Sequence, residues 1–229
     1  MKKELLIFGA NGALGKGITE VLTKKDFNKA YLFDFDLKGL PEGKNIIKIM
    51  IKDLADEKNV IDAFSKVKPL KQKYYFLFST VGGFAGGNKI WETKTEEFNK
   101  MINMNLKSSF FIAKHFARLV KESSGGSICF TAAFTGVNPE TKKAAYGSAK
   151  AALIHLVKTL ALEGKEINLT ANAIAPYIID TPANRKWMPG KDADYEKWMK
   201  PQEIGELVNS IFNHFNFLTG NIINLTHRF

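Results

Sequence analysis

The chain has 229 residues, of which 45% are hydrophobic and 24% charged, so it is neither disordered nor fibrous. We interpret residues 1–229 as one domain, because no linker rich in Pro, Gly or Ser divides them. No long apolar run predicts a membrane span, and the apolar segment from Leu5 to Phe8 is too short for the core of a signal peptide. The lone Cys129 excludes a disulfide framework and indicates a reducing, cytoplasmic environment.

The formal net charge is +10, which raises the question of a nucleic-acid partner. The basic residues are 30 Lys and three Arg, however, and the lysines are spread along the whole chain. Proteins that bind nucleic acid favour the planar Arg side chain, so scattered lysines indicate a solvated surface. We therefore expect no nucleic-acid and no membrane partner, although the positive field would attract an anionic cofactor or substrate.

Short apolar runs alternate along the chain with amphipathic stretches of helix length. This alternation predicts an α/β fold, a Rossmann-type, doubly wound parallel sheet in a single domain. The runs are mostly continuous, as in strands that helices cover on both faces. They predict seven strands, over residues 5–8, 30–35, 46–51, 74–79, 127–131, 170–175 and 222–225.

Helical spacing of apolar residues predicts helices over 60–67 and 145–160, and from Pro201 onward. The longest predicted helix runs from Thr95 to about Val120. Its apolar stripe, from Phe98 to Phe116, contains Asn105 and Ser109. A buried Asn needs hydrogen-bond partners, so Asn105 is a candidate functional residue.

Seven residues that include three glycines directly follow the first predicted strand: Gly9, Ala10, Asn11, Gly12, Ala13, Leu14 and Gly15. A glycine turn between a strand and a helix exposes backbone N–H groups at the helix start, which bind the pyrophosphate of a dinucleotide. Asp34 ends the second predicted strand, 19 residues after Gly15, where a carboxylate accepts hydrogen bonds from the adenosine ribose. Together these features predict a dinucleotide site.

The carboxylate of Asp34 also bears on the choice of cofactor. A negative charge repels a 2′-phosphate, and no Arg follows Asp34 to offset it, so we expect NADH rather than NADPH. Lys38 is close enough along the sequence to keep NADPH as the less favoured alternative.

Tyr146 and Lys150 are one turn apart on the helix predicted over 145–160, so their side chains share a face. An ammonium close to a phenol favours the phenolate, and we therefore expect Lys150 to lower the pKa of Tyr146 from its usual value of about 10. Such a tyrosine exchanges protons near neutral pH. Beside a nicotinamide that supplies hydride, it would act as a general acid.

With these motifs in this order, the chain resembles the short-chain dehydrogenase/reductase family over essentially its whole length. The resemblance implies that Tyr146 donates a proton, that Lys150 also holds the nicotinamide ribose, and that Asn105 anchors a water-linked proton relay. Asp53 would approach the adenine, and Thr181 would meet the carboxamide of the nicotinamide. It further implies a cofactor site formed by Gly9, Asn11, Gly12, Ala13, Leu14, Gly15, Asp34, Asp53, Leu54, Gly82, Gly83, Tyr146, Lys150 and Thr181.

Two positions depart from the family pattern. Most members have a Ser 13 residues before the Tyr, where its hydroxyl polarises the substrate carbonyl, whereas this chain has Ala133. One such hydrogen bond is typically worth about 3 kcal/mol of transition-state stabilisation, so its loss favours an intrinsically reactive substrate. Thr131 and Thr135 are the alternative sources of a hydroxyl. The second departure is Tyr177, after Pro176, where Gly is usual.

One branch of the family lacks that Ser: the dihydropteridine reductases, which reduce quinonoid dihydropterins with NADH. The chain is similar to this branch at residues 9–15, 81–88 and, most specifically, 180–189. Phe84 takes the place of an aromatic residue that lies against the pterin, and Trp187 lies in a segment, Asn184 to Pro189, with the character of a lid. We expect Phe84, Ala133 and Trp187 to contact the substrate.

The sequence leaves three other functions open: a general carbonyl or alcohol oxidoreductase of the same family, a dinucleotide-binding sensor without turnover, and a nucleic-acid module. The histidines, His115, His155, His214 and His227, are too scattered to predict a metal site. The family resemblance implies homodimers or homotetramers, which associate through the helices that carry Asn105 and Tyr146.

Overall fold

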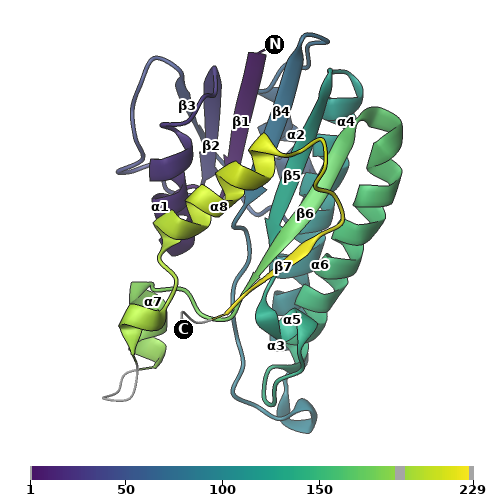
Figure 1. The fold of residues 1–229 in the computed structure, drawn as a ribbon. Helices are drawn as coiled ribbons and strands as arrows, with labels where there is room; N and C mark the ends of the chain where they lie inside the picture. Colours follow the sequence, from purple (N-terminus) through teal and green to yellow (C-terminus); the bar gives the residue numbers. More distant parts are fainter. Residues whose placement is uncertain (1, 189–193, 227–229) are drawn as a thin grey trace.

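The carboxyl ends of seven parallel strands meet at one edge of a single sheet (Figure 1). The computed structural model describes residues 2–188 and 194–226. The sheet order is β3-β2-β1-β4-β5-β6-β7. The strands are β1 (Lys2–Phe8), β2 (Lys29–Asp34), β3 (Ile46–Met50), β4 (Lys73–Ser79), β5 (Gly125–Thr131), β6 (Leu169–Pro176) and β7 (Ile222–Leu225).

The strand order reverses at β1, because β2 pairs with one side of it and β4 with the other. In an open parallel sheet, the connections that leave the carboxyl ends at such a point diverge to opposite faces and leave a crevice between them. Residues that follow β1, β2 and β4 therefore border the same crevice. The sequence prediction of a doubly wound parallel sheet with seven strands is confirmed.

Alternate residues of the strands enter two separate hydrophobic cores. In β1, Leu6 and Phe8 belong to one core, whereas Leu5 and Ile7 belong to the other. This alternation explains the continuous apolar runs in the sequence, since both faces of the sheet are covered. In the first core Phe8 stacks on Phe33 of β2, with ring centroids 4.2 Å apart. That contact fixes the ends of the two strands from which the glycine turn and Asp34 extend.

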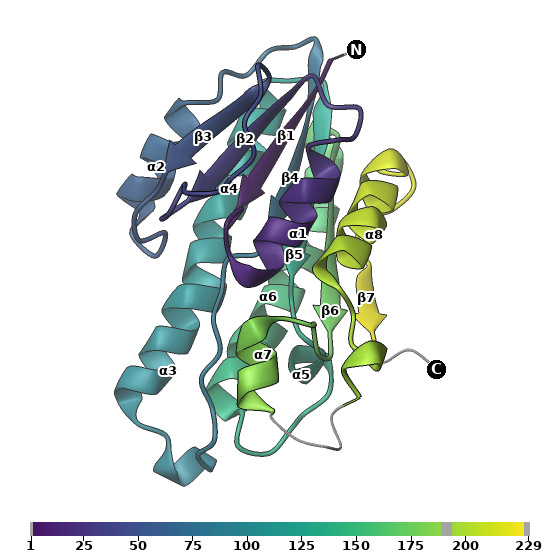
Figure 2. The same ribbon diagram turned by 90° about the vertical axis from the view of Figure 1, so that its left-hand side faces the viewer.

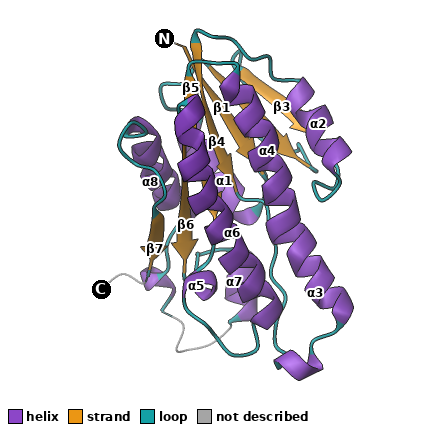
Figure 3. Ribbon diagram, turned by 90° about the vertical axis from the view of Figure 1, so that its right-hand side faces the viewer, coloured by secondary structure: helices purple, strands orange, loops and turns teal. Residues whose placement is uncertain are grey.

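Helices α1 and α8 cover one face of the sheet (Figure 2), and helices α2, α4 and α6 cover the other (Figure 3). The short helices α5 and α7 lie beyond the carboxyl ends of the strands (Figure 1). The α-helices are α1 (Ala13–Leu22), α2 (Glu57–Ser65), α3 (Thr95–Ile102), α4 (Ser108–Lys121), α5 (Phe134–Val137), α6 (Ala144–Glu163), α7 (Pro182–Trp187) and α8 (Pro201–Asn213). The 3-10 helices are η1 (Ile90–Glu92), η3 (Gly164–Ile167) and η4 (Tyr195–Lys197).

The long helix predicted from Thr95 to about Val120 is present, but it is interrupted by a π-helical segment, η2 (Asn103–Lys107). The interruption changes which residues face inward before it: Met101 is buried, whereas Phe98 is 46% exposed. After it, Ser109 and Phe116 are buried as the stripe predicted. Short π-helical segments occur frequently at functional sites, and this one carries Asn105.

Within the described part of the chain, no helix has the length and apolar character that crossing a membrane requires.

Candidate active site

The glycines of the turn after β1 allow other groups to approach its backbone closely. Gly9 has a φ of +78°, which favours glycine. A Cβ at position 15 would lie 1.9 Å from the carbonyl oxygen of Gly9, so only glycine lets α1 start this close to the strand. Gly12 is the N-cap of α1 and has no side chain. The first backbone N–H groups of α1 are therefore open to an anion, in the arrangement that binds a pyrophosphate.

Asp34, at the end of β2, is buried and fixes this turn. Its Oδ2 accepts a hydrogen bond from the backbone N–H of Asn11 at 2.7 Å, and its Oδ1 accepts one from Asp36 at 3.3 Å. The Nδ2 atom of Asn11 donates to the carbonyls of Asp36 and Lys38. Among the described residues, the buried Oδ1 atom of Asn11 has no donor. A buried acceptor without a donor is costly, so this atom fits a ligand that donates to it.

Two adjoining cavities lie at the carboxyl ends of the strands. One has a volume of about 230 Å³ and is lined by Gly9, Asp34, Phe35, Asp53 and Leu54 among others. The second, of about 400 Å³, is lined by Ala13, Leu14, Gly83, Tyr146, Lys150 and Thr181 among others. Both are lined by Gly12, Thr80 and Gly82, at the glycine turn. Two cavities joined at an anion-binding turn fit the two nucleosides and the pyrophosphate of a nicotinamide dinucleotide.

Asn105 holds the loop after β4. Its Oδ1 accepts from the N–H of Gly83 at 3.1 Å, and its Nδ2 donates to the carbonyls of Gly83 at 2.9 Å and Met101 at 3.1 Å. Gly82 has a φ of +153°, and a Cβ there would lie 2.6 Å from Oδ1 of Asn105 and 3.2 Å from Nζ of Lys150. The buried amide therefore positions the Gly82–Gly83 backbone next to Lys150. The proton relay that we expect from Asn105 stays a prediction.

Tyr146 and Lys150 lie on the same face of α6, as the sequence predicted, but the pKa of Tyr146 shifts in the direction opposite to expectation. Nζ of Lys150 is 5.9 Å from the centroid of the Tyr146 ring and donates to the carbonyl of Thr131 at 2.7 Å. Burial lowers the pKa of Lys150 to about 7. Burial, together with the charge of Glu140, raises the pKa of Tyr146 to about 12. The expected depression of the Tyr146 pKa by Lys150 is therefore wrong in this structure, because burial and the charge of Glu140 both raise that pKa.

This correction does not remove Tyr146 as a proton donor. A phenol with a pKa of about 12 is protonated throughout the neutral range, and the protonated form is the one that a general acid needs. The raised pKa is therefore consistent with Tyr146 as a proton donor.

No hydroxyl replaces the absent Ser at position 133 in the described structure. Ala133 is buried at the wall of the 400 Å³ cavity. The hydroxyl of Thr131 donates to the carbonyl of Ser79 at 2.9 Å, and the hydroxyl of Thr135 donates to the carboxylate of Glu140. Each of the two threonines that the sequence left as alternatives thus donates to another part of the protein. The cavity retains a phenol as acid and lacks the neighbouring hydroxyl.

Aromatic rings form the outer wall of the same cavity. The Phe84 ring meets Tyr146 edge-on, with centroids 5.1 Å apart, and meets Trp187 at 5.4 Å. Tyr177, the second departure from the family pattern, also lines the cavity and packs against Phe134 at 5.2 Å. Phe84, Tyr177 and Trp187 are 44%, 45% and 57% exposed. Large exposed rings around one cavity are suited to a flat, conjugated ligand.

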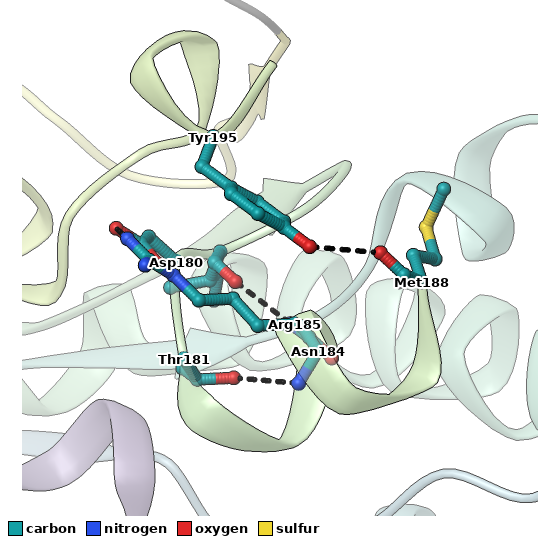
Figure 4. A network of polar contacts seen from close by, with 7 residues as sticks. Asp180, Thr181, Asn184, Arg185, Met188 and Tyr195 are labelled. Carbon is teal, nitrogen blue, oxygen red and sulfur yellow. Dashed lines mark hydrogen bonds and ion pairs between the residues drawn. The ribbon is translucent and has the colours of Figure 1, made fainter. Parts of the chain in front are cut away.

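The segment predicted as a lid is the short helix α7, and polar contacts fix its start (Figure 4). The hydroxyl of Thr181 accepts from the N–H of Asn184 at 3.2 Å, which leaves its hydrogen for the cavity. Arg185 makes two hydrogen bonds to Asp180, at 2.6 and 2.8 Å, and its guanidinium lies 4.7 Å from the centroid of the Tyr195 ring. Trp187 is thus held at the cavity mouth by its own helix. Pro189, predicted to stiffen the far end, lies outside the described residues.

Three residues of the site were not identified from the sequence. Phe35, directly after Asp34, is 62% exposed and lines the 230 Å³ cavity, where an aromatic ring suits an adenine. Glu140 and Lys143 form an ion pair of 2.8 Å beside Tyr146. Their spacing before Tyr146 was visible in the sequence, but that spacing alone does not distinguish a cavity wall from a surface loop.

Among the residues that the structure describes, no three His, Cys, Asp or Glu side chains form a group that could hold a metal ion. His115 contacts Glu57 at 2.9 Å, and Nδ1 of His214 lies 2.8 Å from the carbonyl of Ser210. His227 lies outside the described residues.

Comparison with known proteins identifies the family of the chain. The family model described as short chain dehydrogenase matches residues 3–192. A dihydropteridine reductase of Dictyostelium discoideum is 32% identical over 210 residues, covering 90% of this chain and 86% of that protein. An NAD-dependent glycerol dehydrogenase of Listeria innocua is 26% identical over 208 residues, covering 87% and 79% of the two chains.

Solved structures show the same fold. A structure described as ElxO with NADP bound superimposes with a TM-score of 0.85 at 24% identity, covering 99% of this chain and 98% of that one. The chain belongs to the short-chain dehydrogenase/reductase family, a class of oxidoreductases with a Rossmann-type fold for a nicotinamide dinucleotide. Among these three proteins, the Dictyostelium dihydropteridine reductase shares more identical residues with this chain, 32%, than the glycerol dehydrogenase or ElxO does, at 26% and 24%.

Proposed function

We propose that this protein is an NADH-dependent reductase of a reactive conjugated imine, such as a quinonoid dihydropterin. The observation that carries the proposal is the position of Ala133. The cavity offers an acid, Tyr146, and aromatic walls, but the hydroxyl that polarises an ordinary ketone is absent, and neither Thr131 nor Thr135 supplies it. A substrate that is already a strong hydride acceptor does not need that hydrogen bond. The similarity to a dihydropteridine reductase supports the same substrate class.

In this proposal, different residues of the site bind the cofactor and transfer the proton. Asp34 and the backbone around Gly12 hold the adenosine ribose and the pyrophosphate, with Asp53 toward the adenine. When bound, NADH supplies the hydride. Tyr146 donates the proton that completes the addition of hydrogen across the imine, and Lys150 holds the nicotinamide ribose. These roles follow the family resemblance.

NADH is the proposed cofactor in preference to NADPH. The carboxylate of Asp34 lines the cavity proposed for the adenosine, where it would repel a 2′-phosphate. Lys38, the residue that kept NADPH open, is exposed and its backbone carbonyl accepts from Asn11. The ElxO structure contains NADP, but that protein is only 24% identical to this chain. The similarity therefore supports a common fold and does not indicate which cofactor this chain binds.

We further propose a homodimer or homotetramer that associates through α4 and α6. Phe110 of α4 is 49% exposed and Leu162 of α6 is 67% exposed, although both are apolar. We place the protein in a reducing compartment such as the cytoplasm, where the buried thiol of Cys129 stays reduced.

The experiment that tests the function is NADH oxidation with chemically generated quinonoid dihydropterin, in parallel with a panel of ketones; polyols are assayed separately, by reduction of NAD+. We expect turnover with the dihydropterin and little with ketones. Turnover with ketones alone would favour the general carbonyl oxidoreductase, the alternative that the similarity to a glycerol dehydrogenase supports. NADH binding without any turnover would favour the sensor.

A further inference from the structure

Lys143 is a cation in the wall of the proposed substrate cavity. It is the N-cap residue of α6, three residues before Tyr146, and it lines the 400 Å³ cavity. Its Nζ atom lies 6.0 Å from the ring centroid of Phe84 and 5.7 Å from that of Trp187. These are the two aromatic residues that the sequence predicted at the substrate. The ammonium therefore sits at the aromatic end of the cavity.

A neighbouring ion pair holds this ammonium in place. Oε1 of Glu140 is 2.8 Å from Nζ of Lys143, and the other carboxylate oxygen accepts from the hydroxyl of Thr135. Burial opposes the ionisation of Glu140, but the hydrogen bonds from Lys143 and Thr135 outweigh it and lower the pKa of Glu140. The carboxylate is thus charged at neutral pH and keeps Lys143 oriented.

The ion pair does not use the full capacity of the ammonium. An ammonium has three donors, and Glu140 accepts one of them. The side chains of Lys143 and Glu140 are only 22% and 25% exposed, so the remaining donors are partly shielded from water. A partly shielded cation at the wall of a cavity gains more from an electron-rich oxygen of a ligand than a surface lysine does.

The surroundings restrict what that ligand is. The rings of Phe84, Tyr177 and Trp187 favour a flat conjugated molecule, and the position of the ammonium requires an oxygen acceptor at the edge of it. A dihydropterin has such an oxygen, the carbonyl of its pyrimidinone ring. This step rests on the proposed function.

We propose that Lys143 is a substrate-binding residue that donates to the pyrimidinone carbonyl of the pterin, held in position by Glu140. The contact is present before and during hydride transfer, so it contributes to substrate binding more than to the rate of the chemical step. It also selects flat substrates with an oxygen acceptor over flat substrates with an amino group at that position.

The test is the steady-state kinetics of the Lys143→Met and Lys143→Arg variants with quinonoid dihydropterin and NADH. Met keeps an unbranched side chain, one atom shorter than that of Lys, and removes the charge. We expect K143M to raise the KM for the dihydropterin about 10- to 100-fold, as the loss of a hydrogen bond to a charged group implies, with little change in kcat. Arg keeps the charge and restores most of the affinity. The dissociation constant of NADH should stay unchanged.

The control is Lys24→Met, which removes an exposed lysine just after α1, outside the cavity lining and outside α4 and α6, and should leave all constants as in the wild type. A second measurement compares two inhibitors, pterin and a diaminopteridine in which an amino group replaces the carbonyl. The wild type should bind pterin more tightly, and K143M should lose that preference. A purely structural role would lower the melting temperature without changing the preference.

The outcomes separate this inference from the function on which it rests. Wild-type protein that does not reduce quinonoid dihydropterin would overturn the proposed function and this inference with it. Wild-type protein that reduces it, while K143M keeps both the wild-type KM and the preference for pterin, would overturn this inference alone.

Discussion

Restoring the missing hydroxyl by Ala133→Ser tests why the substrate must be reactive. Ala133 has an extended backbone, with φ of −159° and ψ of 152°, and is the N-cap of α5. Ser is favoured at an N-cap, so the substitution should not destabilise the fold. Its one additional atom enters a cavity of about 400 Å³. A single donor to the developing oxyanion is worth about 3 kcal/mol, and we therefore expect kcat/KM for ketones to rise about 100-fold.

The assay is NADH oxidation with ketones and with quinonoid dihydropterin, for the wild type and for A133S. The rate with the dihydropterin should change little, because that substrate does not depend on the added donor. Ala133→Cys is the matched control, since its thiol adds an atom at the same place but is only a weak donor. If A133S is folded, keeps its dihydropterin rate and gains nothing on ketones, the link between Ala133 and substrate reactivity is refuted.

Three further predictions concern the cofactor site and Tyr146. Gly15→Ala places a Cβ 1.9 Å from the Gly9 carbonyl oxygen, so we expect weaker NADH binding in fluorescence titrations and a lower melting temperature; wild-type values of both would contradict the turn geometry. Asp34→Asn removes the charge that disfavours a 2′-phosphate, and the ratio of kcat/KM for NADPH to that for NADH should rise at least about 10-fold. An unchanged ratio would show that Asp34 does not select the cofactor. The charge of Glu140, together with burial, raises the pKa of Tyr146, and Glu140→Gln removes that charge. The pKa of Tyr146 should therefore fall, so that Tyr146 loses its proton at a lower pH. We expect the basic limb of the pH profile of kcat to move to lower pH. A limb that stays in place or moves up would contradict this assignment.

Much of the fold was predictable because it depends on local patterns. Continuous apolar runs marked all seven strands within a few residues, since helices cover both faces of the sheet. The glycine turn and Asp34 were predictable because a tight turn between strand and helix restricts which residues fit. Tyr146 and Lys150 share a helical face for the same local reason.

The parts that the sequence did not predict depend on burial and on side-chain partners that the apolar pattern does not reveal. The π-helical segment at Asn105 changes which residues of the helix face inward, and the spacing of the apolar stripe does not reveal this change. The direction of the Tyr146 pKa shift is set by burial and by Glu140, whereas the sequence pattern suggests only the attraction to Lys150. The role of Thr131 likewise follows from a partner, Ser79, that is 52 residues away in the sequence and becomes a neighbour only on folding.

The central claim is that Tyr146 supplies the proton in an NADH-dependent reduction of a conjugated imine. Single-turnover oxidation of bound NADH by quinonoid dihydropterin, for the wild type and for Tyr146→Phe, tests it most directly. We predict rapid oxidation by the wild type and a rate about 100- to 10,000-fold lower for Y146F, with the affinity for NADH unchanged. Equal rates for the two proteins, or a wild type that transfers hydride to ketones and not to the dihydropterin, would contradict the claim.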